Sequence, residues 1–180
     1  MVGLRKGSAY SRKHVVPYTR KSRKKSKAYI KSVPPQNVVK FIMGDEKLYD
    51  SGKLPFHITL IADEGLQIRS NALEACRQFI NKNLETNFPG QYFFKVAKYP
   101  HHVQRENKMI TGAGADRMQT GMQLSFGKPM GRAAILKKGD EIFFMALPNR
   151  KADSMARLSV NQIRSKLPGK KRVVSEEIRS

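Results

Sequence analysis

Alternation between apolar and polar positions marks most of the strands that the sequence predicts. Residues 56–63 show it most clearly, since Phe56, Ile58 and Leu60 fall on one side of an extended chain, as expected for a strand with one buried face. Residues 141–147 are apolar on both sides, which predicts a central strand. The strands predicted from such patterns cover residues 38–42, 56–63, 91–99, 118–126, 133–136, 141–147 and 172–178.

Two other segments repeat apolar residues at spacings of three and four, the pattern of an amphipathic helix. The first begins at Asn71, which can cap a helix, with Glu74 three positions later, and it ends before Pro89. The second begins after Asn149 and ends at Pro168. The predicted buried stripes are Leu73, Cys76, Phe79, Ile80 and Leu84 in the first helix and Ala152, Met155, Ala156, Val160, Ile163 and Leu167 in the second.

Two helices among many strands predict an α+β fold, a mixed and mostly antiparallel sheet with both helices packed on one face. Residues 45–53 are polar and are predicted to form a turn. Pro34 and Pro35 separate the folded part from the chain before it. We therefore expect an extended basic arm over residues 1–35 and a single α+β domain over residues 36–180.

A long loop over residues 101–117 interrupts these patterns. Its residues repeat neither every 2 nor every 3.6 positions, and Gly112 and Gly114 give its backbone freedom. Loops of this length inside a domain are usually functional or become ordered on binding. We expect a mobile basic loop that leads into the strand at 118–126, with a second basic turn at residues 127–132 beyond that strand.

The charge of the chain indicates the class of its partner. The 180 residues include 35 Lys and Arg against 14 Asp and Glu, a net charge of +21, so the expected partner is a polyanion. Residues 1–44 contain no acidic residue, and Tyr10, Tyr18 and Tyr29 are interleaved with their basic residues. Cationic side chains neutralise phosphates and tyrosines stack on unpaired bases. We expect the arm to become ordered on RNA; a solvated tail or a localisation signal is the alternative interpretation.

Cysteine content and hydropathy exclude other classes. The single Cys76 excludes an internal disulfide and is expected to be buried on its helix. No apolar run approaches the roughly 20 residues that span a bilayer, and the N-terminus lacks the apolar core of a secretory signal. We expect a cytoplasmic protein without a membrane segment.

No motif in the chain indicates catalysis. The adjacent His101 and His102 would point in different directions and make a poor metal pair, and His57 has no other ligand type at a useful spacing. Residues 112–117, GAGADR, lack the lysine of a phosphate-binding loop and the third glycine of a dinucleotide fingerprint. No serine lies in a nucleophile elbow, and no pair of carboxylates has a setting that suggests acid–base catalysis. We expect no catalytic residue, no metal and no cofactor.

Two neighbouring motifs carry a resemblance to a known family. Residues 115–122, ADRMQTGM, and residues 125–131, SFGKPMG, resemble the signature of the L10e family of large-subunit ribosomal proteins, the archaeal and eukaryotic counterparts of bacterial L16. The similarity extends over most of the chain, including PYTRK at residues 17–21 and SNALEACR at residues 70–77. The family motif carries an arginine directly after its Gly-Met pair, where this chain has Gln123.

The resemblance implies a structural constituent of the large ribosomal subunit in the cytoplasm. Proteins similar to this one contact the large rRNA beside the small (5S) rRNA, border neighbouring ribosomal proteins and help position the acceptor ends of tRNAs. Their loop that matches residues 101–116 approaches the peptidyl-transferase centre, where the chemistry belongs to RNA. The resemblance therefore implies that the chain is not an enzyme, and we expect no homo-oligomer.

Two other classes remain open on the residues alone. An RNA-processing or RNA-modifying enzyme could use His101, His102 and Lys108. A basic regulator of DNA is disfavoured, because no helix presents base-reaching side chains between turn signals.

The candidate interface has two sets of residues. Those predicted to bind rRNA lie in the arm and in the turn at 127–132: Arg5, Lys6, Arg12, Lys13, Arg20, Lys21, Arg23, Lys24, Lys25, Lys27, Lys128 and Arg132. Those predicted to lie near tRNA belong to the loop: His101, His102, Arg105, Lys108, Gly112, Gly114 and Arg117.

Overall fold

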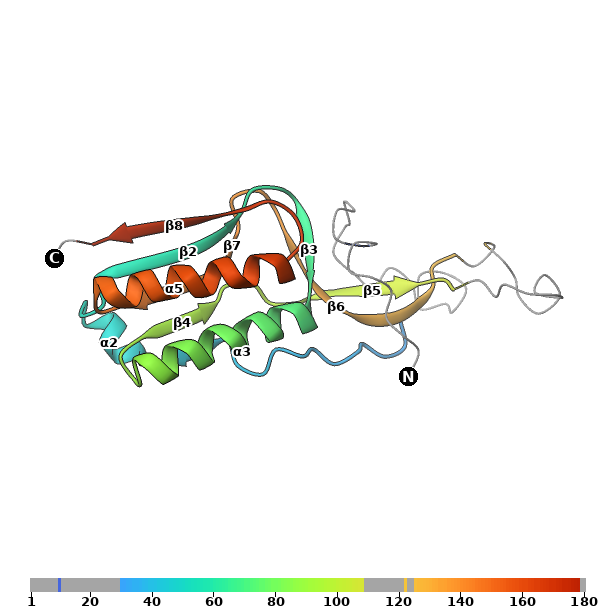
Figure 1. Cartoon of the computed structure of the whole chain (residues 1–180). Coiled ribbons are helices and arrows are strands. Elements are labelled where there is room, and N and C mark those ends of the chain that lie inside the picture. The colour runs from blue at the N-terminus through green and yellow to red at the C-terminus, as the bar shows by residue number, and fades with distance from the viewer. Residues whose placement is uncertain (1–9, 11–29, 109–121, 123–124, 179–180) are drawn as a thin grey trace.

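The structure is a computed structural model that describes Tyr10, residues 30–108, Met122 and residues 125–178 (Figure 1). Every strand pairing within these residues is antiparallel, which confirms the α+β class. The elements in chain order are β1 (Ile42–Gly44), α2 (Glu46–Asp50), β2 (Phe56–Ala62), β3 (Leu66–Arg69), α3 (Ser70–Asn87), β4 (Phe93–Val96), β5 (His102–Glu106), β6 (Lys128–Leu136), β7 (Glu141–Leu147), α5 (Arg150–Ile163), the 3-10 turn η1 (Arg164–Lys166) and β8 (Lys171–Glu177).

The larger sheet has five strands in the order β1-β4-β7-β2-β8. β7 lies at its centre, as the apolar run predicted, because both of its faces are covered. Phe143 and Met145 belong to the main core, whereas Ala146 belongs to a smaller apolar cluster that includes Leu54. β8 corresponds to the strand predicted at residues 172–178 and forms one edge of this sheet.

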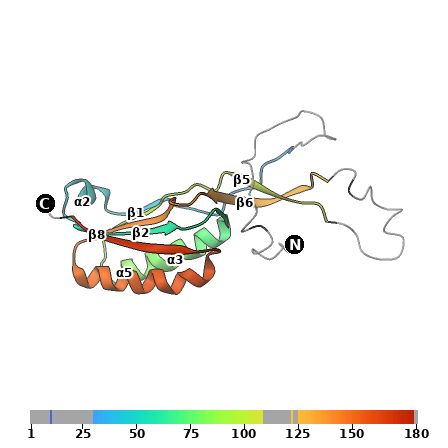
Figure 2. The ribbon, with the colours of Figure 1, turned by 90° about the horizontal axis from the view of Figure 1, so that it is seen from above.

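Helices α3 and α5 lie side by side on one face of the five-stranded sheet, as expected (Figure 2). Their predicted stripes are buried, apart from the half-buried Phe79 and Met155. Cys76 is fully buried, and burial raises the pKa of its thiol to about 11. Among the described residues, no helix is both long and apolar enough to cross a membrane.

The opposite face of the sheet carries the short helix α2, where the sequence predicted only a turn (Figure 2). Asp45 caps it, because its Oδ1 accepts the backbone N–H of Lys47 at 2.9 Å. Tyr49 then stacks on Phe93 of β4, with ring centroids 4.6 Å apart. His57 of β2 is a structural residue in this cluster, 5.7 Å from the Tyr49 ring.

The predicted helix caps were wrong in detail. α3 begins at Ser70, after Arg69, without a side-chain cap hydrogen bond. Glu74 binds Arg77 through two hydrogen bonds instead of reaching back to the helix start. Asn149 does precede α5, but its side chain makes no capping bond.

The smaller sheet, of order β3-β6-β5, corrects the prediction of a continuous loop over residues 101–117. Residues 102–106 form β5, and residues 128–132 of the predicted basic turn at 127–132 form the first half of β6. β3 was not predicted. The sequence showed no alternation here because polar side chains are buried: Gln104 donates its amide N–H to Gln67 Oε1 at 3.2 Å.

The predicted strand at 118–126 lies largely outside the described residues. Its described members, Met122, Ser125 and Phe126, lie in turns, so at those positions the prediction was wrong. Gln123, where the family motif carries arginine, lies outside the described residues, as do Gly112, Gly114 and Arg117.

Candidate nucleic-acid interface

The β5–β6 hairpin carries the described part of the candidate loop away from the body of the molecule (Figures 1 and 2). His102 pairs with Ala133 at its root, and Glu106 pairs with Lys128 at its outer end. The register shifts between Gln104 and Arg105, which marks a bulge that increases the local twist. The root is therefore fixed in the core of the smaller sheet, while basic residues occupy the outer end.

His101 and His102 lie on different sides of the chain, as their adjacency predicted. His102 is only 4% exposed, and burial, followed by the charges of Arg105 and His101, lowers its pKa to about 4. It is neutral near pH 7, and its Nδ1 has no hydrogen-bond partner in the described structure. His101 is exposed, with its ring Nδ1 3.1 Å from the carbonyl oxygen of Tyr99.

This geometry does not fit a metal site or a pair of catalytic histidines. Within the described residues, no group of three His, Cys, Asp or Glu side chains could hold a metal ion. A buried histidine that stays neutral to about pH 4 cannot exchange a proton with its exposed neighbour near neutral pH.

Arg105 lies over an aromatic ring at the outer part of the hairpin. Its guanidinium carbon is 4.0 Å from the centroid of Phe126, a cation–π contact that restricts the side chain. Lys128, the first residue of β6, and Lys108, two residues beyond the end of β5, are both exposed. Three of the predicted cations are thus gathered on one projecting ribbon.

Arg132, also predicted to bind RNA, is engaged with the protein itself. Its Nε–H donates to the carbonyl oxygen of Pro34 at 2.7 Å, and its Nη1 donates to the hydroxyl of Tyr99 at 3.0 Å. These bonds fix the end of the predicted arm against β6. Ile30, 5% exposed, is buried in the same part of the chain.

Tyr10 of the arm contacts both the hairpin and Arg69, the last residue of β3, which the sequence analysis did not predict as part of the interface. The Arg69 guanidinium carbon lies 5.3 Å from the centroid of the Tyr10 ring. The Tyr10 hydroxyl donates to the carbonyl oxygen of Arg105 at 3.4 Å. The ten predicted cations between Arg5 and Lys27 lie outside the described residues.

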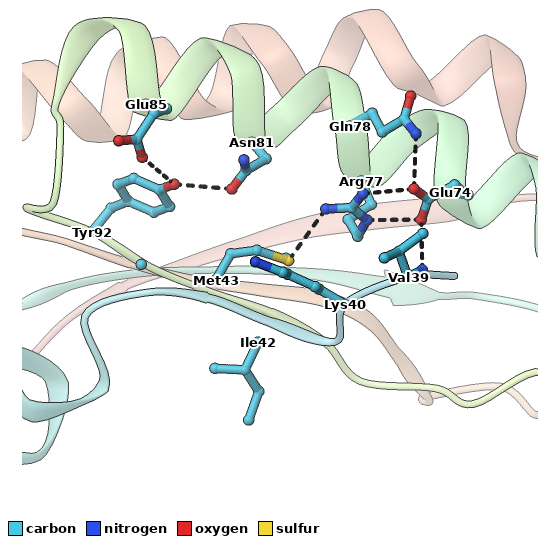
Figure 3. Close-up of a pocket in the computed structure, with 11 residues that line it drawn as sticks. Val39, Lys40, Ile42, Met43, Glu74, Arg77, Gln78, Asn81, Glu85 and Tyr92 are labelled. Carbon is cyan, nitrogen blue, oxygen red and sulfur yellow. Dashed lines mark hydrogen bonds and ion pairs between the residues drawn. The ribbon is translucent and has the colours of Figure 1, made fainter. Parts of the chain in front are cut away.

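A cavity of about 540 Å³ between α3 and the chain around β1 is the other candidate site (Figure 3). Glu74 and Arg77 line it and hold each other at 2.6 and 2.8 Å, and the hydrogen bond from Arg77 lowers the pKa of Glu74 despite its burial. Glu74 also accepts the backbone N–H of Val39 at 3.3 Å. The Tyr92 hydroxyl contacts Asn81 and Glu85 at 2.9 and 2.7 Å.

Most polar groups of this cavity are therefore bonded to one another, whereas Lys40 is exposed at its edge. The bonds tie the segment before β1 to α3, so we interpret the cavity as a structural brace and not as a catalytic centre.

Comparison with known proteins agrees with this picture. The family model described as ribosomal protein L16p/L10e matches residues 17–174. The chain is 40% identical to the large ribosomal subunit protein uL16 of Nanoarchaeum equitans over 182 residues, covering 100% of this chain and 97% of that protein. It is 39% identical to uL16 of Thermofilum pendens, with 97% and 98% covered, and 42% identical to uL16 of Hyperthermus butylicus, with 84% and 79% covered. The chain belongs to the ribosomal protein L16p/L10e family and is a structural ribosomal protein, not an enzyme.

Proposed function

We propose that this protein is a structural constituent of the large ribosomal subunit that binds rRNA and helps to position tRNA acceptor ends near the peptidyl-transferase centre. Family membership and the names of its relatives support a place in the large subunit of the cytoplasmic ribosome. The net charge of +21 supports a polyanionic partner. Its partners are then the large rRNA near the 5S rRNA, tRNA and neighbouring ribosomal proteins.

The observation that carries the proposal is the projecting β5–β6 hairpin with Arg105, Lys108 and Lys128 at its outer end. A narrow two-stranded ribbon can enter a space between RNA segments that the body cannot enter. Cations on it contact phosphates, which position a protein without reading much sequence. The stacked Arg105 side chain is already restricted, so less of its conformational entropy is lost on binding.

The arm is the second RNA-binding element of the proposal. Arg132 fixes its end at Pro34, and Tyr10 lies against both Arg69 and Arg105. These contacts support an arrangement in which arm and hairpin meet the RNA together, with the arm following rRNA and the hairpin directed toward tRNA.

Sedimentation tests the proposal. Tagged protein in cell extract is separated on a sucrose gradient at moderate and at high salt, and RNA is extracted from each fraction. The proposal predicts co-migration with large subunits and translating ribosomes that resists moderate salt. Protein at the top of the gradient, or bound to one non-ribosomal RNA, would refute it.

The tRNA role needs its own test. Arg105, Lys108 and Arg117 are changed together to Gln, and the control changes the exposed Lys47, Lys53 and Lys82 of the body to Gln. We expect the first variant to enter large subunits that bind tRNA less tightly, and the control to match the wild type. Unchanged tRNA binding and translation in the first variant would refute the proposed tRNA role and would indicate that this segment only connects the strands.

A further inference from the structure

Three turns that are distant in the sequence meet at one corner of the body (Figure 1). They are the turn between β2 and β3, the turn between β6 and β7, and the chain that leads from η1 into β8. Ala62 donates its N–H to the carbonyl oxygen of Asp140 at 2.9 Å and accepts the N–H of Gly139 at 2.8 Å. Asp63 donates its N–H to the carbonyl oxygen of Lys170 at 3.0 Å.

The acidic residues of this corner are occupied in holding the turns together. Asp140 accepts the backbone N–H of Lys137 at 2.8 Å and pairs with the Lys98 ammonium at 3.1 Å. Burial opposes its ionisation, but these bonds outweigh burial and lower its pKa. Glu64 accepts the backbone N–H of Lys170 at 2.7 Å. Two of these three bonds go to the backbone N–H groups of Lys137 and Lys170 and not to the ammonium groups of those lysines.

The third acid, Asp63, pairs with Arg172 at 3.4 Å. Among the described residues, the ammonium groups of Lys137, Lys138 and Lys170 make no hydrogen bond or ion pair, although the Lys137 charge helps to lower the pKa of Asp140. All three residues are exposed. Of these three, Lys170 also lines an open recess of about 540 Å³, together with Asp63, Arg164, Ser165, Gly169 and Lys171. Three turns joined by backbone hydrogen bonds thus carry three exposed cations, one of which lines the recess.

We propose that this three-turn surface, formed by Lys137, Lys138 and Lys170, binds the phosphodiester backbone of rRNA as a contact separate from the arm and the hairpin tip. The inference rests on the proposed function of the protein. Lys128 is the first residue of β6, and Lys137 directly follows its last residue. The two lysines are nine residues apart, which corresponds to at most about 30 Å at 3.3 Å per residue. The protein therefore joins two stretches of RNA backbone through one strand.

RNA suits this surface better than a protein partner. Lysine is a compact, flexible point charge that matches phosphates without demanding fixed geometry. None of the exposed large hydrophobic side chains of the described structure lies in the three turns, whereas protein interfaces centre on buried apolar or aromatic anchors.

The experiment compares two full-length variants with equal loss of charge. One changes Lys137, Lys138 and Lys170 to Gln; the control changes Lys47, Lys53 and Lys82, which are exposed on α2, the turn after it and α3. Binding of each purified protein to large-subunit rRNA is measured between about 50 and 200 mM salt, where phosphate contacts determine the slope of log K against log salt. Circular dichroism checks that each variant is folded.

If the three lysines contact phosphates, the slope of log K against log salt should fall in magnitude by about 2 to 3 in the first variant, because each neutralised phosphate contributes about 0.7 to 0.9. The control should keep most of the wild-type slope. Equal slopes for the two variants would overturn the inference. If the wild type itself failed to bind rRNA, the proposed function would fail instead.

Lysine acetylation of intact large subunits gives a second readout. The three lysines should be protected in the subunit and become reactive after ribonuclease digestion. Protection that survives digestion would indicate an acidic protein partner and would overturn the assignment to RNA.

Discussion

Arg132 in β6 donates its Nε–H to the carbonyl oxygen of Pro34 at 2.7 Å, although the two residues are 98 positions apart in the sequence. The bond joins the end of the arm to the strand that forms half of the projecting hairpin. A residue predicted to touch RNA thus also positions the segment that carries most of the predicted RNA contacts.

Replacing Arg132 by Met should release the end of the arm. The change removes the donors to Pro34 and Tyr99 but keeps an apolar stem, so we expect the free energy of unfolding to fall by about 1–2 kcal/mol. The chain near Pro34 should become more sensitive to protease. Urea unfolding and limited proteolysis measure both effects. Lys128→Met is the control, and an equal change in that variant would show that the bond to Pro34 has no special role.

Replacing Gly127 by Ala should distort the outer end of the hairpin, where residue 127 leads into β6. Gly127 has a φ of 81°, and a Cβ there would lie 2.6 Å from the carbonyl carbon of Glu106 and 2.8 Å from the nitrogen of Asn107. We expect a loss of about 2 kcal/mol or more. Gly131, in β6 four residues further on, has open space at its Cβ position. Gly131→Ala should change the stability by less than about 0.5 kcal/mol, and similar losses in the two variants would contradict the argument.

Breaking the Glu74–Arg77 pair from one side should be costly. The two side chains are 11% and 10% exposed, and Glu74→Gln leaves the Arg77 charge without its anion, at a cost of about 3 kcal/mol. Since Glu74 also accepts the N–H of Val39, amide exchange at Val39 should become faster. Glu74→Gln combined with Arg77→Met should recover much of the loss, and a strictly additive double variant would count against a coupled brace.

Protonation of His102 should make stability depend on pH below neutrality. Its pKa is about 4 in the folded protein against an ordinary value of 6.5. As pH falls from 6.5 toward 4 the unfolded chain binds a proton that the folded protein does not, so stability is lost over this window. The loss can reach at most about 3 kcal/mol.

Urea unfolding at pH 7 and pH 4.5 measures this effect. His102→Gln should show a smaller difference between the two pH values than the wild type, and His101→Gln should behave like the wild type. A His102→Gln protein with the full pH dependence would assign the effect to another group.

Elements with one buried apolar face could be predicted from the sequence. β2 and the stripe of α5 bury the residues that their spacing indicated, because hydrophobic burial alone determines their orientation. The central position of β7 followed from its apolar character on both faces.

The smaller sheet could not be predicted in the same way. Gln67, His102 and Gln104 are buried there, so polar residues occupy core positions and hide the period of two. β5 is specified by its pairing with β6, which depends on residues about 30 positions away. Local pattern carries no information about such a partner.

The same reason explains what was missed in the candidate interface. Arg69 ends β3, a strand that the sequence did not predict, and its contact with Tyr10 depends on how the arm is placed. The three-turn surface joins residues from three separate turns, and Lys137 and Lys170 are brought together only by backbone bonds through Ala62 and Asp63. The spacing of basic residues in the sequence gave no sign of this cluster.

Crosslinking from the hairpin within purified large subunits tests the central claim most directly. A photoreactive group is placed at Lys108 on the hairpin and, as a control, at Lys82 on the outer surface of α3, both exposed positions. The account predicts that Lys108 crosslinks to rRNA in empty subunits and also to the acceptor end of tRNA in loaded ribosomes, in higher yield than Lys82. Crosslinks from Lys108 to protein alone, or RNA crosslinks no stronger than those from Lys82, would contradict it.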